Sequence, residues 1–333
     1  MTRELRRFLR VASGFIALNV MLFMAAELWL RRHAADHFLA DRNLRASIAK
    51  FELRARSVDV LFLGDSMAHF GIDPDAIPLP GLQLHNFAFP GEPPATTYYK
   101  VNYYLERGDL THLQLAVVHL NYYSLTDDNR AGLNTDYDYS RFYDYWDIAK
   151  HQEPRQTLLA VLGQSSLFRL HTDFVGQIQF RSLDAEPEPS AAGFGVRQDF
   201  VPSADVERQT LADLNSRLDE PHLRIRIGAV ENYRRLVNLF RDRGIKVVFL
   251  QLPTLAVVRA NDRMAPDLLN AVLERRTVRT IEHLFPGLPT INTADAGMAW
   301  RAEDFADAMH LNQAGARILG ERLAAELPAV LNP

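Results

Sequence analysis

Apolar and polar positions along the chain follow two periods, short apolar runs typical of buried strands and longer amphipathic stretches typical of helices. The first clear strand pattern covers residues 58–63, where five of six residues are apolar and β-branched residues lead. Further strands are predicted over 82–89, 113–120, 245–252 and 290–292. Because helical stretches separate the strands, we expect right-handed crossovers and a parallel sheet.

The predicted helices lie between these strands and at the end of the chain. Residues 225–243 carry an apolar stripe at helical spacing, and Gly244 follows where a glycine commonly ends a helix. Other helices are predicted over 96–105, over about 266–284, and after Gly315 up to Pro328. The pattern as a whole predicts an α/β domain around a central, mostly parallel five-stranded sheet.

Residues 126–204 interrupt this alternation and form an inserted segment. Six aromatic residues and four aspartates crowd residues 136–147. Aromatic rings beside carboxylates suit sugar rings, which stack their C–H faces and donate hydroxyl hydrogen bonds. The alternative is that these rings pack onto the domain. Residues 185–203 are rich in Pro and Gly and predict a long loop. The candidate substrate-binding residues are Tyr122, Tyr137, Tyr139, Tyr143 and Trp146.

The N-terminus carries a membrane-targeting pattern. Four arginines precede an apolar run over residues 11–30, which is just long enough to span a bilayer. The basic side is N-terminal, so we expect a cytoplasmic tail and an exported domain in a single-pass inner-membrane protein. A cleaved signal peptide is the alternative. The expected organisation is tail and anchor (1–32), helical stalk (33–56) and domain (57–333).

Composition narrows the possible chemistry. The chain of 333 residues is 47% hydrophobic, enough for a large core, and its net charge of −4 does not suggest a nucleic-acid partner. It has no cysteine, which excludes disulfides, thiolate zinc sites and cysteine nucleophiles. No motif indicates a metal or cofactor, and we expect neither.

Three predicted strands end in a glycine or a small polar residue, namely Ser66, Gly91 and Asn121. The carboxyl ends of parallel strands share one edge of the sheet, where open α/β sheets bind ligands. Ser66, in the sequence Gly-Asp-Ser, is a candidate nucleophile there. Taken alone, the same sequence is equally compatible with a residue that caps a helix.

Asp307 and His310 lie three residues apart before the last predicted helix. This spacing lets the carboxylate bond the imidazole, which could then act as a base toward a neighbouring hydroxyl such as Ser66. The backbone N–H groups of Ser66 and Gly91 and the side-chain amide of Asn121 could stabilise an oxyanion. Each residue also has an ordinary structural explanation, but together they are all explained by a single site with a serine nucleophile.

This set of residues resembles the SGNH (GDSL-type) hydrolase superfamily. The similarity covers Gly64-Asp65-Ser66, Gly91, Asn121 and Asp307-x-x-His310, and spans about residues 58–327. It implies a three-layer flavodoxin-like sandwich in which Ser66, His310 and Asp307 form a catalytic triad and Ser66, Gly91 and Asn121 the oxyanion hole. Two departures are visible: the family's Gly-x-Asn-Asp block reads His119-Leu120-Asn121-Tyr122 here, and Gly91 stands in Phe-Pro-Gly-Glu-Pro-Pro.

The predicted anchor and these departures look similar to the polysaccharide-modifying branch, which includes alginate O-acetylation proteins and the D-alanyl transfer protein of teichoic acid synthesis. The resemblance implies an O-acyltransferase that moves an acyl group, expected to be acetyl, to a cell-surface polysaccharide beside a membrane-bound O-acyltransferase partner. A carbohydrate or lipid esterase is the second hypothesis. A non-catalytic scaffold that binds glycan or the partner is the third. A dinucleotide-binding domain is disfavoured, because only one of the required glycines is present.

Overall fold

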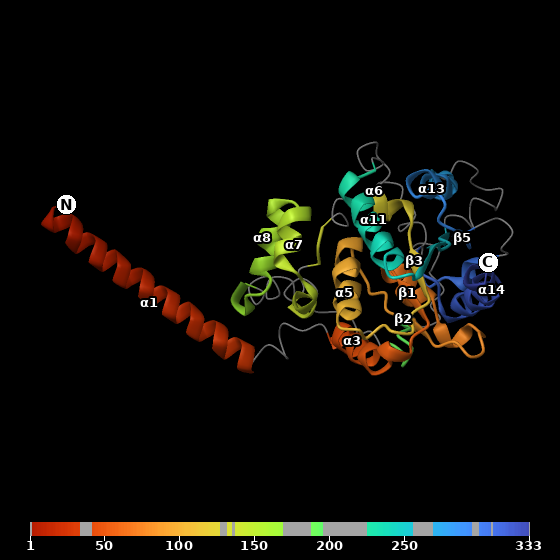
Figure 1. The fold of residues 1–333 in the computed structure, drawn as a ribbon, viewed down its shortest axis with the longest axis horizontal. Coiled ribbons are helices and arrows are strands. Elements are labelled where there is room, and N and C mark those ends of the chain that lie inside the picture. The colour runs from red at the N-terminus through yellow and green to blue at the C-terminus, as the bar shows by residue number, and fades with distance from the viewer. Residues whose placement is uncertain are drawn as a thin grey trace.

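A parallel five-stranded sheet forms the centre of the protein (Figure 1). The computed structural model describes residues 2–33, 42–126, 132–134, 137–168, 188–195, 225–255, 269–294, 300–307 and 309–332. The strand order is β2-β1-β3-β4-β5, which is the flavodoxin-like order. The strands are β1 (Val60–Leu63), β2 (Leu84–Asn86), β3 (Leu115–His119), β4 (Lys246–Gln251) and β5 (Thr290–Asn292). All five predicted strands and their parallel arrangement are therefore confirmed.

Helices cover both faces of the sheet because successive strand residues point to opposite sides. Leu61 and Leu63 join the core on one face, whereas Val60 and Phe62 join the core on the other. The first face packs against α3 (Arg42–Arg54), α5 (Pro94–Glu106), α11 (Ile227–Arg241) and α13 (Leu269–Leu284). The second packs against α4 (Ser66–Gly71) and α14 (Gln313–Leu331), which completes three layers.

The chain reverses its direction of travel across the sheet at β1. β2 pairs with one edge of β1, and the chain then returns to place β3 on the other edge, so that Phe62 lies beside both Asn86 and Val117. In open α/β sheets such a switch point opens a crevice at the carboxyl ends of the strands. The segments that follow β1 and β3 meet at this point.

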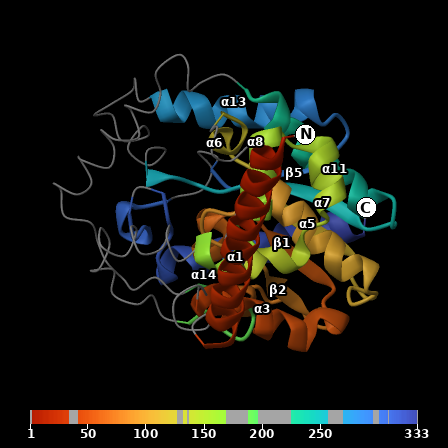
Figure 2. The same cartoon turned by 90° about the vertical axis from the view of Figure 1, so that its left-hand side faces the viewer.

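The longest helix, α1 (Arg3–His33), extends away from the α/β body, and Figure 2 shows it crossing in front of that body. Its most apolar window has a mean hydropathy of 1.8 and is almost entirely exposed. Among the described residues it is the one helix long and apolar enough to cross a membrane. Such a helix is typical of a membrane anchor or of a signal sequence.

Short helices make up most of the described part of the inserted segment and of the connections. Between β3 and α11 lie α6 (Tyr122–Thr126), the 3₁₀ helix η4 (Tyr137–Phe142), α7 (Tyr145–His151) and α8 (Pro154–Leu162). Residues 188–195 lie along the free edge of β2, where the Asn86 N–H donates to Ala192 O at 2.8 Å. The other 3₁₀ turns are η1 (Ala55–Ser57), η2 (Pro74–Ala76) and η6 (Ala302–Asp304).

Two elements differ from the sequence predictions. The helix expected as a stalk over 33–56 exists as α3, but its Leu44, Ile48 and Phe51 are buried in the core, so α3 is part of the α/β body. The final helix does not stop at Pro328 but continues to Leu331. A proline so near the end of a helix removes one hydrogen bond, while the Asn332 N–H still donates to Pro328 O at 2.9 Å.

Candidate active site

The turn after β1 presents Ser66 at the start of α4. Gly64 adopts a φ of +149°, and a Cβ there would lie 2.6 Å from His119 Cβ, so the turn requires glycine. Asp65 is the N-cap of α4, because its carboxylate accepts a hydrogen bond from Met67 N at 3.0 Å. The cap is thus Asp65 rather than Ser66, and the Ser66 hydroxyl makes a different contact.

The Ser66 hydroxyl lies at the end of a chain of three side chains. Ser66 Oγ is 2.9 Å from His310 Nε2, although the two residues are 244 positions apart. His310 Nδ1 lies 2.8 Å from both carboxylate oxygens of Asp307. Because Nδ1 faces a carboxylate, the favoured tautomer carries its proton there and leaves Nε2 as the acceptor for the Ser66 hydroxyl. All three side chains are partly exposed.

A small hairpin before α14 holds Asp307 and His310. An antiparallel bridge pairs Phe305 with Leu311, and the Ala306 N–H donates to His310 O at 2.8 Å. The Asp307 carboxylate also accepts from the backbone N–H groups of Met309 and His310, at 2.8 and 2.9 Å. These bonds fix the carboxylate inside its own loop, so its position does not depend on Ser66.

Asn312 and Phe70 hold this hairpin against the rest of the domain. Asn312 caps α14 by accepting from Gly315 N at 3.0 Å, and its amide donates to Glu303 O at 2.6 Å. The ring of Phe70, on α4, meets the His310 imidazole edge-on with centroids 5.6 Å apart. The helix that presents Ser66 therefore also supports the imidazole that contacts it.

Gly91 lies in the turn that follows β2, close to the end of β1. It has a φ of +69°, and the neighbouring Phe89 N–H donates to Gly64 O at 3.2 Å, which brings this turn beside the Ser66 turn. Gly91 itself is exposed, whereas the next residue, Glu92, is buried. The sequence prediction that these two turns meet at one edge of the sheet agrees with this arrangement.

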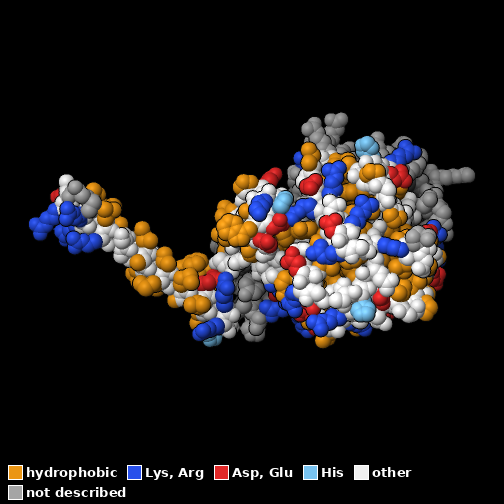
Figure 3. Space-filling model, viewed as in Figure 1, with side chains coloured by type: hydrophobic (Ala, Val, Ile, Leu, Met, Phe, Trp, Pro, Cys, Tyr) orange, Lys and Arg blue, Asp and Glu red, His pale blue; other side chains and the backbone are white. Residues whose placement is uncertain are grey.

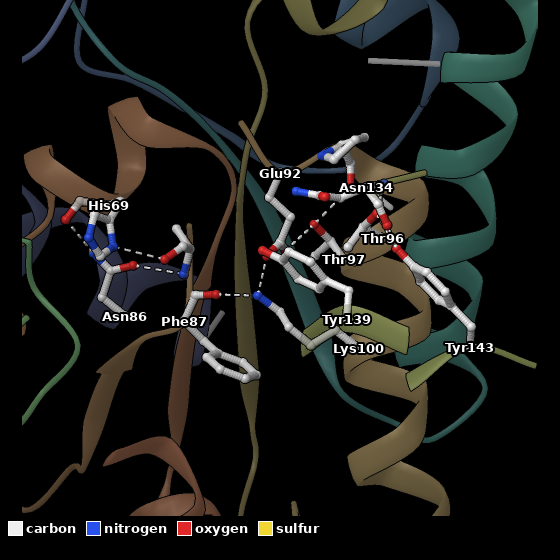
Figure 4. Close-up of polar contacts among 12 residues, drawn as sticks. His69, Asn86, Phe87, Glu92, Thr96, Thr97, Lys100, Asn134, Tyr139 and Tyr143 are labelled. Atoms are coloured by element: carbon white, nitrogen blue, oxygen red, sulfur yellow. Dashed lines mark hydrogen bonds and ion pairs between the residues drawn. The ribbon is translucent and has the colours of Figure 1, made fainter. Parts of the chain in front are cut away.

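Glu92 anchors the Gly91 turn through a buried ionic network (Figure 4). Its carboxylate accepts hydrogen bonds from Thr97 Oγ1 at 2.6 Å and from Tyr139 Oη at 2.8 Å, and pairs with Lys100 Nζ at 2.5 Å. Lys100 also donates to Phe87 O at 2.6 Å. Burial lowers the pKa of Lys100, and the Glu92 charge opposes this shift. The network ties both ends of the turn, residues 87 and 92, to α5.

The Asn121 side chain lies next to the Ser66 turn from the other side. Its Oδ1 accepts from Ser124 N at 2.8 Å and from Ser124 Oγ at 2.9 Å, which caps α6. Its Nδ2 consequently faces Met67, with the sulfur at 3.2 Å. A thioether is a weak acceptor, so this amide can donate to a stronger acceptor such as an oxyanion.

A small cavity of about 10 Å³ separates the Ser66 turn from the Glu92 network. Its lining includes Gly64, Asp65, Glu92 and the buried His119. His119 Nδ1 is 3.2 Å from Asp65 Oδ1, at ion-pair distance but without hydrogen-bond geometry. Polar side chains thus continue from the helix cap at Asp65 to the buried ionic network.

Asn86 is a further residue of this region, which the sequence analysis did not select (Figure 4). Its side-chain amide donates to Ala68 O and Ile72 O, both at 2.8 Å, and its Oδ1 accepts from Ala88 N at 3.1 Å. These bonds link the end of β2 to α4 and so fix the helix that begins at Ser66. The feature of the sequence that could have identified Asn86 is its position as a polar residue inside the predicted strand 82–89.

The candidate substrate-binding aromatic residues do not form one surface. Tyr139 is buried in the core, and Tyr143 is nearly so, with its hydroxyl bonded to Thr96 Oγ1 at 3.1 Å and to Asn134 O. These two rings follow the alternative in which aromatic residues pack onto the domain, and they offer no free face to a sugar. Trp146 is 82% exposed on α7. The side chains of Tyr122 and Tyr137 lie outside the described part of the structure.

The arrangement can perform general-base activation of a hydroxyl. His310 Nε2 is positioned to take the Ser66 proton while Asp307 holds the other nitrogen, and a serine requires such a base to act as a nucleophile near neutral pH. The Ser66 N–H, the first of α4, has no acceptor within the helix, which leaves it available to charge that develops at Ser66. Within the described ranges, no group of three or more His, Cys, Asp or Glu side chains could hold a metal ion.

Comparison with models of known protein families and with curated protein sequences gave no match for this chain. The site is therefore interpreted from its own geometry, together with the resemblance of its motifs.

Proposed function

We propose that this protein is a membrane-anchored serine acyl-transfer enzyme of the SGNH hydrolase type that O-acylates a cell-surface polysaccharide. Two hydrogen-bond contacts carry the proposal: His310 lies 2.8 Å from the Asp307 carboxylate and 2.9 Å from the Ser66 hydroxyl. Gly-Asp-Ser after a buried strand and Asp-x-x-His before the last helix are the motifs of that superfamily, and the flavodoxin-like sheet order is compatible with it.

In the proposed first half-reaction, Ser66 Oγ attacks the carbonyl carbon of the acyl donor as His310 Nε2 accepts its proton. The carbonyl oxygen becomes an oxyanion, and the N–H groups of Ser66 and Gly91 and the Asn121 amide stabilise it. The tetrahedral intermediate collapses to an acyl-serine, and the leaving group takes the proton from His310. Asp307 remains ionised and stabilises the imidazolium.

In the second half-reaction, a sugar hydroxyl gives its proton to His310 and attacks the acyl-serine. Collapse of the second tetrahedral intermediate releases the acylated sugar and returns the proton to Ser66. The apolar helix α1 supports a site close to a membrane, where a membrane-bound O-acyltransferase partner could supply the acyl group. The resemblance, rather than a surface of this chain, is the basis for that partner.

Ester hydrolysis is the second candidate function, because Ser66 and His310 are partly exposed and water can reach them. With water in place of the sugar hydroxyl, the same two steps make the protein a carbohydrate or lipid esterase. A scaffold that binds glycan or the acyltransferase without catalysis is the third. The scaffold hypothesis does not account for the hydrogen-bonded arrangement of Ser66, His310 and Asp307.

The deciding experiment compares polysaccharide O-acetyl content in strains that carry the wild-type chain or Ser66→Ala. Transfer predicts a lower content in the variant, and esterase activity predicts a higher one. An unchanged content would exclude both enzymatic hypotheses for this polymer. Ser57→Ala is the matched control, since this hydroxyl donates to Arg54 O in an exposed turn that precedes β1, whereas Ser66 follows the other end of that strand.

A further inference from the structure

The α7–α8 hairpin exposes large apolar side chains away from the candidate active site. Trp146 on α7 and Leu158 and Val161 on α8 are all exposed, and we call these three residues the hairpin surface. Figure 3 shows hydrophobic side chains gathered over this region, on the side of the body from which α1 extends. Water is an unfavourable environment for such a group of side chains.

The hairpin is firmly attached to the α/β body, so its exposed face does not result from loose packing. Ile148 on α7 and Ala160 on α8 are buried. Asp147 accepts a hydrogen bond from Tyr99 Oη at 2.8 Å and pairs with Arg235, which joins α7 to α5 and α11. The hairpin therefore has a defined inner face, and the hairpin surface is its outer face.

The segment after α8 also binds the C-terminal end of α1. Glu27, within the apolar run of α1, is only 6% exposed and accepts hydrogen bonds from Ser166 N at 2.7 Å and Leu167 N at 3.1 Å. Ser165 Oγ donates to the same carboxylate at 3.1 Å, and Arg31 donates to Gln164 O at 2.7 Å. A carboxylate inside an apolar helix is costly, and these donors compensate it.

These contacts fix the position of the hairpin along the axis of α1. The apolar run of α1 spans residues 11–30, and Trp29 and Arg31 mark its C-terminal end, where aromatic and basic residues commonly meet the membrane boundary. Because Glu27 and Arg31 hold the segment 164–167, the hairpin lies at that boundary, and Figure 1 shows it between α1 and the α/β body.

We propose that the hairpin surface rests in the interfacial layer of the lipid bilayer that α1 enters. A tryptophan with an apolar body and an N–H group suits this layer, and Leu158 and Val161 supply further apolar contact. The nearby exposed charges are mixed, with Lys150 and Arg155 beside Glu153. We therefore expect the contact to be apolar and to occur with zwitterionic lipids. The proposal is independent of the chemistry at Ser66.

The test measures tryptophan fluorescence of the full chain reconstituted in phosphatidylcholine vesicles. The chain contains Trp29, Trp146 and Trp300, so Trp29→Phe and Trp146→Phe assign the emission of the first two by difference. Lipids brominated near the headgroup quench tryptophans in the interface, and aqueous iodide quenches those in water. With brominated lipid, we expect Trp146 to lose a fraction of its emission similar to the fraction that Trp29 loses. We expect iodide to quench Trp146 only weakly.

Leu53→Trp, made in the Trp146→Phe background, is the matched control. Leu53 is 87% exposed on α3, which lies on the body beyond the C-terminal end of α1 (Figure 1). This tryptophan should respond to iodide and not to brominated lipid. If Trp146 behaves like the control, the proposal fails. Protection of Trp146 from both quenchers also overturns it, since a second copy or a protein partner would then cover the hairpin.

The intact mass of the chain recovered from membranes provides an independent check. Retention of residues 1–33 is expected, because cleavage within or after α1 would remove the Glu27 acceptor from Ser166 and Leu167. A mature chain that lacks α1 would overturn the proposal, whatever the activity of the protein.

Discussion

Two polar clusters on either side of the Gly64 turn are built in opposite ways. The Ser66–His310–Asp307 cluster joins residues far apart in sequence, is partly exposed, and is supported by one hairpin and one helix. The Glu92–Lys100 cluster joins residues eight positions apart and is fully buried. An exposed cluster can be altered with little cost to folding, whereas removing one member of a buried ion pair leaves an uncompensated charge. Under the proposed function, the catalytic residues and the residues that support them thus occupy adjacent parts of one edge of the sheet.

The largest expected effect is on activity and comes from the exposed cluster. Under the proposed function, Ser66→Ala removes the nucleophile, and kcat should fall by roughly 10⁶-fold, by analogy with triad serines elsewhere. Because Ser66 is partly exposed and alanine is smaller than serine, thermal stability should hardly change. Hydrolysis of p-nitrophenyl acetate and labelling by a fluorophosphonate measure the loss. Labelling that persists in Ser66→Ala but disappears in another serine variant would identify a different nucleophile.

The next effect is on stability and comes from the buried cluster. Lys100→Met should lower the free energy of unfolding by about 3–5 kcal/mol, because Glu92 stays buried without its counter-charge. Urea unfolding in detergent measures this loss in the free energy of unfolding. The double variant Lys100→Met with Glu92→Gln is the control, since glutamine is uncharged, its Oε1 can accept from Thr97 and its amide can donate to the Tyr139 hydroxyl oxygen. It should recover part of the loss, and no recovery would mean that the lysine acts through packing alone.

A third prediction separates Asn121 from a purely structural role. Asn121→Ala should raise the activation barrier by about 2.7–4 kcal/mol if its amide stabilises the oxyanion. Ser124→Ala removes only one of the two hydrogen bonds to Asn121 Oδ1 and serves as the control, with a much smaller effect on kcat. Comparison of kcat and urea midpoints checks the prediction. Equal loss of kcat in the two variants would assign Asn121 to the cap of α6.

The smallest effect is a pH dependence of stability that originates in the buried region. Burial, with smaller contributions from the charges of Arg54 and Lys100, lowers the pKa of His85 to about 3. Between this value and an unfolded value near 6.5, the unfolded chain binds a proton that the folded chain does not. Stability is therefore lost as the pH falls through this window, by about 2 kcal/mol between pH 6.5 and 5.

His85→Phe tests this prediction, because the ring already lies among Phe51 and Phe87, with centroids 5.2 and 6.3 Å away. The variant should unfold at nearly the same urea concentration at pH 6.5 and pH 5, apart from the contribution of other groups. If the difference in urea midpoint between variant and wild type is the same at pH 6.5 and at pH 5, His85 does not account for the pH dependence of stability.

The sheet and the Asp307–His310 contact were predictable because each depends on a local pattern. Buried parallel strands have continuous apolar runs, and the three-residue spacing of Asp307 and His310 brings their side chains together within one loop. Their approach to Ser66 followed from the motif resemblance and from the shared edge of a parallel sheet. The contact distance of 2.9 Å agrees with that expectation.

The supporting residues were harder to predict because several of their partners come from other helices of the fold. Asn86 bonds to carbonyl groups of α4, and Glu92 to Tyr139 of η4, contacts that no spacing in the sequence reveals. The burial of α3 was visible in principle, since Leu44, Ile48 and Phe51 recur at helical spacing, but the many charged residues around them favoured a stalk. Sequence patterns thus predicted the candidate catalytic residues better than the residues that position them.

The hairpin that carries Asp307 and His310 also sets the order in which the site can arise during synthesis. The strands β1 and β3 and the Ser66 turn all precede it, and His310 comes 244 residues after Ser66. Under the proposed function, a growing chain exposes Ser66 only as an ordinary alcohol until this hairpin has left the ribosome and packed against α4. A fragment that stops before the hairpin contains all five strands of the sheet and would still be inert toward esters.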